Sequence, residues 1–170
     1  MHESTRRLFW FATGYRRVAD CALRMKNVAI ILVLLLGGFG IARLSGAGVT
    51  SAGRIGIASV FAFTALGHFV KRDEMAAMLP PSVPARPTII ILSGLLEAVL
   101  AMLVVAPAYS KVAGLALCIF LMLVTPVNIY AAIKKVDFGG HGAGSKYLWL
   151  RLPLQVVLLG WIYWFAVRAS

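Results

Sequence analysis

The chain has 170 residues, of which 61% are hydrophobic and only 14% are charged, and its formal net charge is +11. This composition excludes an ordinary soluble globular domain and predicts an integral membrane protein that contacts the lipid bilayer. The basic residues lie between long apolar runs, which is typical of segments facing anionic lipid headgroups and argues against a nucleic-acid partner.

The N-terminal part, residues 1–50, is predicted to hold a basic leader and one spanning helix. Met1 to Lys26 mixes arginines with aromatic residues, so it is either an amphipathic segment on the membrane surface or a basic tail that enforces topology. Val28 to Ala42 is uninterruptedly apolar and reaches a spanning length at Ala47. A cleaved signal peptide ending near Ala47 is the alternative, but the leader is long for the charged region of such a peptide.

Residues 51–170 contain four further apolar runs, each long enough to cross a bilayer. The whole chain is therefore predicted to be an all-α polytopic membrane helix bundle, in which a four-helix domain follows one extra N-terminal transmembrane helix. The runs are Ile55 to Val70, Thr88 to Ala108, Val112 to Ile133 and Tyr147 to Val167.

The connection from Lys134 to Lys146 is rich in glycine and deserves comparison with phosphate-binding loops. Gly139 and Gly144 have the required spacing, but Ser145 stands where such a loop needs its lysine. The sequence therefore predicts a flexible connection with His141 exposed to solvent.

The basic residues also predict an orientation in the membrane. With five spans, thirteen of the 17 lysines and arginines fall on the side of the N-terminus and four on the other. Because basic loops stay in the cytoplasm, we expect a cytoplasmic N-terminus and an external C-terminus.

Glu97 is the only acidic residue within the long apolar runs, which makes it the principal site candidate. A carboxylate in the bilayer core costs about 2.5 to 3.5 kcal/mol on insertion scales, so it is expected to face protein or a wet cavity. Gly94, Ala98 and Ala101 lie on the same side of the predicted helix. This small-residue side is expected to press against a neighbouring helix.

Five polar side chains are predicted to form a ligand-binding cluster in the cytoplasmic half of the bundle. If all helices start at one plane, His68 lies at a depth of about 3 Å, Arg151 at about 6 Å, Asn128 at about 8 Å, Gln155 at about 12 Å and Glu97 at about 15 Å. These depths predict Gln155 as the nearest partner of Glu97, with Arg151 reaching it only through other groups. We expect a cavity that opens toward the cytoplasm.

Each of the other four members also has a structural explanation. His68 suits a helix end at the interface, and Arg151 suits a topology anchor that reaches the headgroups. Asn128 follows a proline and can satisfy freed backbone groups, while Gln155 can join two helices.

Five short motifs between about Ile55 and Val167 occur in an order that resembles the DoxX-like family of small bacterial membrane proteins. They are Gly67-His68-Phe69; Met78-Leu79-Pro80-Pro81 with Val83-Pro84; Gly94 with Glu97; Pro126-Val127-Asn128-Ile129-Tyr130; and Arg151-Leu152-Pro153-Leu154-Gln155 with Trp161. The resemblance implies a four-helix membrane bundle. Some relatives, called DoxD, are membrane subunits of a thiosulfate:quinone oxidoreductase.

Two classes of function remain open at this point. The first, which the resemblance favours, is a membrane subunit of a quinone-linked redox system, with a bound quinone and a partner redox subunit. The second is a non-catalytic protein that binds or transports a small molecule or lipid, or acts as a scaffold, alone or as a homo-oligomer. No residue is predicted to be catalytic and no metal site is predicted, because Cys21 and Cys118 form neither a CxxC nor a metal-ligand pattern and are not expected to pair.

Overall fold

A computed structural model of the chain describes residues 26–136, 138, 141 and 144–169. The leader before Lys26, with Cys21, and much of the glycine-rich connection lie outside these residues, so the expectations for them stay predictions. The regular structure of the described residues is helical throughout. Five of their helices are long and apolar enough to span a membrane, as expected of a multi-pass membrane protein.

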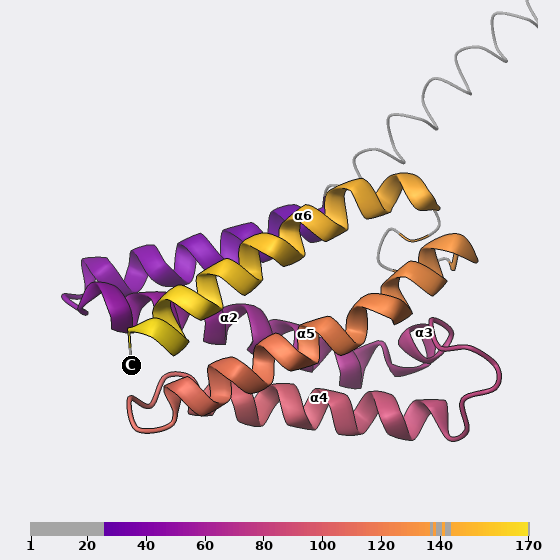
Figure 1. The fold of residues 1–170 in the computed structure, drawn as a ribbon, viewed down its shortest axis with the longest axis horizontal. Helices are drawn as coiled ribbons and strands as arrows, with labels where there is room; N and C mark the ends of the chain where they lie inside the picture. Colours follow the sequence, from indigo (N-terminus) through magenta and orange to yellow (C-terminus); the bar gives the residue numbers. More distant parts are fainter. Residues whose placement is uncertain (1–25, 137, 139–140, 142–143, 170) are drawn as a thin grey trace, which may run out of the picture.

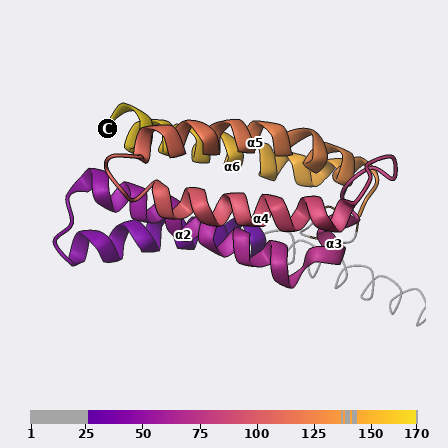
Figure 2. The same cartoon turned by 90° about the horizontal axis from the view of Figure 1, so that it is seen from below.

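The helices form an elongated bundle in which consecutive spanning helices run in opposite directions (Figure 1). Figure 2 shows α5 and α6 side by side in one layer, with α4 and α2 beneath them. The helices are Lys26–Leu44, α2 (Val49–Val70), the short α3 (Arg72–Ala76), α4 (Arg86–Leu103), α5 (Ser110–Ile133) and α6 (Ser145–Ile162), which continues as the π-helical turn η2 (Tyr163–Arg168).

The five predicted runs coincide with the five helices long and apolar enough to span a membrane, and two of their boundaries differ from the predictions by more than two residues. α2 begins at Val49, six residues before the predicted Ile55, because the polar and glycine residues in between continue the helix. α4 ends at Leu103 rather than at Ala108, since the residues before Pro107 form turns. Pro87 lies in the first turn of α4, where its missing N–H costs no hydrogen bond.

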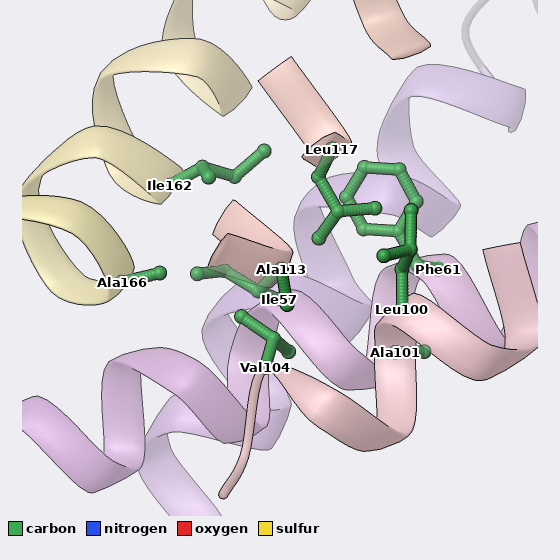
Figure 3. Close-up of a cluster of buried hydrophobic side chains, with 9 residues drawn as sticks. All are labelled: Ile57, Phe61, Leu100, Ala101, Val104, Ala113, Leu117, Ile162 and Ala166. Carbon is green, nitrogen blue, oxygen red and sulfur yellow. The ribbon is translucent and has the colours of Figure 1, made fainter. Parts of the chain in front are cut away.

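A cluster of buried apolar side chains joins the four helices α2, α4, α5 and α6 with η2 near one end of the bundle (Figure 3). Small residues in it let the helix backbones approach closely. Its members are Ile57, Phe61, Leu100, Ala101, Val104, Ala113, Leu117, Ile162 and Ala166.

The N-terminal helix Lys26–Leu44 belongs to the same bundle. Its buried residues Ile31 and Leu35 pack with Val60 of α2 and Leu158 of α6. A methyl group on Gly56 of α2 would come within 2.6 Å of the Leu35 carbonyl oxygen, so the two helices touch backbone to backbone. The predicted extra helix is therefore packed against α2 and α6.

The outer surface of the bundle is apolar on all five long helices. More than half of the side-chain surface is exposed at Val33, Leu66, Leu92, Met122 and Val156, one on each helix. Exposing such an apolar surface to water is unfavourable, whereas lipid tails solvate it. The exposed side chains are therefore consistent with contact to a bilayer.

Arg54 is a buried cation in the second turn of α2, where the sequence had placed it in the connection before the span. Its side chain is 4% exposed. The guanidinium donates from Nε to the Phe165 carbonyl at 3.1 Å and from Nη2 to the Ala169 carbonyl at 3.3 Å. Arg54 thus satisfies carbonyls at the end of the last helix, which have no helical N–H to accept from.

We therefore expect Arg54→Leu to destabilise the protein substantially. The substitution removes two hydrogen bonds from a charged donor, each worth about 1.5 to 3 kcal/mol. Thermal unfolding of the detergent-solubilised protein measures the loss. Arg43→Leu is the matched control, because Arg43 is exposed and, among the described residues, bonds only the nearby Ala47 carbonyl. Equal unfolding temperatures for the two variants would contradict the structural role of Arg54.

Candidate functional site

Glu97 lies in the middle of α4, about 16 Å along the helix from Arg86, and is only 4% exposed. Its carboxylate faces α2, where Nδ1 of His68 is 3.3 Å from Oε2. The same nitrogen lies 2.9 Å from the carbonyl oxygen of Thr64. Glu97 and His68 therefore form a buried pair between two membrane-spanning helices.

The shared nitrogen leaves the carboxylate incompletely satisfied. A carbonyl oxygen only accepts, so the Nδ1 proton of His68 points at Thr64. Glu97 Oε2 is close enough for an ion pair with His68, yet it is buried and accepts no hydrogen bond from the described residues. A buried acceptor without a donor costs about 1 to 3 kcal/mol, which makes this atom the strongest sign of a functional site.

Gly94 lets α4 approach α2 closely enough for Glu97 and His68 to meet. A methyl group on Gly94 would come within 2.5 Å of the His68 Cβ, so α4 contacts α2 most closely one turn before Glu97. Of the predicted small-residue side, Gly94 and Ala101 are buried and Ala98 is half-buried, and the contact with α2 lies at Gly94.

The depth ranking of the polar side chains was wrong for this pair. His68 is two residues from the end of α2 but lies beside the middle of α4. The first turns of α4 extend past the end of α2 and pack instead on α3 and its flank, where Ile90 meets Ala76 and Leu79. The helix ends are staggered, so depths counted from a common plane do not apply.

Gln155 is not the partner of Glu97. Its Nε2 donates to the carbonyl oxygen of Leu121, at 2.8 Å, and to Oγ1 of Thr125, both on α5. The reason is packing order, since α6 lies against α5 whereas α4 lies against α2. Leu121 and Thr125 precede Pro126 in α5, so Gln155 joins two helices where the proline interrupts the backbone ladder.

Asn128 belongs to a third group, at the end of α5. Its Oδ1 lies 3.3 Å from Nε2 of His141, and Nδ1 of His141 lies 2.8 Å from the carbonyl oxygen of Phe138. The imidazole also meets the ring of Tyr147 edge to face, with centroids 4.9 Å apart. His141 is 2% exposed, so the prediction of a solvent-exposed histidine was wrong.

The hydrogen bonds of His141 constrain its protonation. Nδ1 must donate to the Phe138 carbonyl, so Nε2 carries a second proton only in the charged form. Burial, followed by the positive charge of Arg151, lowers the pKa of His141 below its usual 6.5. Only the charged ring can donate from Nε2 to Oδ1 of Asn128, which lies 3.3 Å away, whereas the neutral ring accepts at Nε2.

The structure thus divides the five predicted site residues among three places. His68 and Glu97 lie between α2 and α4, Gln155 lies between α6 and α5, and Asn128 lies at the end of α5 beside His141. Arg151 is half-buried one turn after Tyr147 and acts on His141 through its charge.

Two residues that lie beside Asn128 or its partner, Tyr147 and His141, were not predicted as site residues from the sequence. Tyr147 is 1% exposed, and its hydroxyl is the second buried group without a hydrogen-bond partner among the described residues. No pattern in the glycine-rich stretch indicates that His141 is buried. The four-residue spacing of Tyr147 and Arg151 does indicate that these two residues lie on one helix face. Within the described part of the chain, no group of three His, Cys, Asp or Glu residues could hold a metal ion.

Residues 57–166, well over half of the chain, match the protein family described as a domain of unknown function (DUF8561). The chain belongs to this family. No curated protein and no solved structure matches it. The matched residues contain Glu97 and His68, so the buried pair lies inside the family domain.

The contact at Gly94 can be tested by adding one methyl group. Gly94→Ala forces its new Cβ against the His68 Cβ, and overpacking of this kind costs about 1 to 3 kcal/mol. We expect a lower unfolding temperature in detergent. Gly40→Ala is the control, because a Cβ there meets nothing within 4 Å. If Gly94→Ala is as stable as Gly40→Ala, the close approach of α4 to α2 is refuted.

His141 predicts a loss of stability in acid. Because its folded-state pKa lies below 6.5, the unfolded chain binds more protons between the two pKa values, and stability rises with pH across that window. The unfolding temperature is therefore expected to fall between pH 7.5 and pH 5, by about 2 to 4 °C per kcal/mol lost.

The measurement compares wild type with His141→Gln at both pH values. The variant has no imidazole at this position, so its drop in acid should be smaller, while His68 contributes equally to both proteins. An identical drop in the variant would assign the acid sensitivity to another group.

Proposed function

We propose that this protein binds an uncharged small molecule within the membrane, at the Glu97 and His68 pair. The observation that carries the proposal is the buried Oε2 of Glu97, which accepts no hydrogen bond from the described residues. A ligand that carries a hydroxyl or amine donor would supply the missing hydrogen bond.

The charges of the site support an uncharged ligand. The Glu97 carboxylate lies 3.3 Å from the His68 imidazole, whose protonated form balances its charge. An ionic ligand would add a charge to the bilayer interior without compensation. The His68 side chain is 14% exposed, against 6% for Glu97, so access to the carboxylate is expected along the histidine.

A quinol is a specific ligand class that meets this requirement, because its ring hydroxyls are donors and its tail is apolar. The resemblance to DoxX-like proteins supports the same class. The second candidate function is therefore a membrane subunit of a quinone-linked redox system, in which a partner subunit would exchange the electrons. Its proposed place is the bacterial cytoplasmic membrane with the N-terminus inside, and a C-terminal reporter active only in the cytoplasm would contradict this orientation.

The test is to identify what co-purifies with the full chain and to vary Glu97. Wild type in mild detergent is extracted with organic solvent, and the extract is analysed by mass spectrometry. Glu97→Gln should keep the fold and part of the ligand, since its amide oxygen still accepts. Glu97→Leu should lose the ligand while its unfolding temperature stays close to that of wild type, because Nδ1 of His68 keeps the Thr64 carbonyl as its partner.

Leu96→Gln serves as the control, because it changes polarity at the next residue, whose side chain is 48% exposed. The control should retain the ligand. If Glu97→Leu retains as much ligand as wild type, Glu97 is not the binding site. A quinol in the extract favours the redox candidate, and another hydroxyl-bearing or amine-bearing molecule favours non-catalytic binding.

A further inference from the structure

An open apolar groove with a volume of about 590 Å³ follows one face of α5. The residues that line it are spaced by three or four positions, so they form a single stripe on the helix. Thr125 and Pro126 provide the short side chains between the longer ones. The lining residues are Met122, Thr125, Pro126, Ile129, Tyr130 and Ile133.

The groove has the length of one lipid leaflet. From Met122 to Ile133 the helix rises about 16 Å, which is about half of the 30 Å hydrocarbon thickness of a bilayer. The groove faces outward, since the side chains of Met122 and Ile133 are 64% and 62% exposed. An acyl chain that runs parallel to α5 would fill it from the middle of the bilayer to the end of the helix.

Two lysines follow the groove at the level expected for the headgroup of that lipid. Lys134 and Lys135 directly follow the last lining residue, at the end of α5, and both are exposed. Lysines at this level attract anionic headgroups. The apolar groove and its basic end therefore match the two parts of one anionic phospholipid.

We propose that α5 holds an anionic phospholipid, with an acyl chain in the groove between Met122 and Ile133 and the phosphate at Lys134 and Lys135. This site lies on the outer face of α5 and is independent of the ligand proposed for Glu97. A second copy of the chain fits the groove less well. Two copies in the same orientation, paired around a twofold axis through this face, would bring their lysines together and repel each other.

Native mass spectrometry of the full chain, titrated with lipid in detergent, tests the proposal. The probes are phosphatidylglycerol and phosphatidylcholine with identical acyl chains. Wild type should bind phosphatidylglycerol more tightly. Lys134→Gln combined with Lys135→Gln should weaken that binding by up to about 25-fold, since each basic residue near the headgroups contributes about a fivefold factor.

Matched variants separate a defined site from general attraction. Lys71→Gln combined with Lys111→Gln removes the same charge from exposed positions elsewhere and should leave binding unchanged. Met122→Trp should weaken binding of both lipids by filling the groove. Met102→Trp is its control, because Met102 lies on α4 and is 68% exposed.

The proposal is overturned if the two lysine pairs have equal effects or if the two lipids bind alike to wild type. It is also overturned if Met122→Trp lowers a dimer signal while lipid binding stays unchanged, because a second copy would then occupy the groove.

Discussion

The contact between α2 and α4 at Gly94 is the constraint on which the buried pair of Glu97 and His68 depends. Without a side chain at Gly94, the two backbones approach until the Cβ of His68 fills the space. One turn further along α4, Glu97 is then buried against His68 instead of facing lipid. A larger residue at position 94 would separate the helices and expose a carboxylate in the bilayer core, where charge is costly.

Three of the larger polar side chains inside the bundle satisfy backbone groups of a neighbouring helix. Arg54 bonds carbonyls at the end of η2, Gln155 bonds a carbonyl of α5 near Pro126, and Trp161 donates to the Gly53 carbonyl of α2 at 3.2 Å. These contacts are structural, because lipid offers no alternative partners. Oε2 of Glu97 and the hydroxyl of Tyr147 differ from these groups, because they are buried without a hydrogen-bond partner among the described residues.

Sequence patterns predicted local features well and pairings poorly. Helix length and hydropathy correctly identified five helices long and apolar enough to span a membrane, since both properties depend on nearby residues. Arg54 was placed in the connection before its span, and His141 in a solvent-exposed loop. The structure buries both, one against η2 and the other against Asn128.

By itself, the sequence determined the all-helical membrane class and the number of candidate spans, because both follow from the length and hydropathy of the apolar runs. It also determined the singular position of Glu97, because burying a charge in lipid is unfavourable in any arrangement of the helices. Only the tertiary structure decided which polar groups meet. The stagger of α4 past α2 brings His68 to Glu97, and the packing of α6 on α5 takes Gln155 away from it. Stagger and packing order depend on side-chain fit between helices far apart in the chain, which no local pattern records.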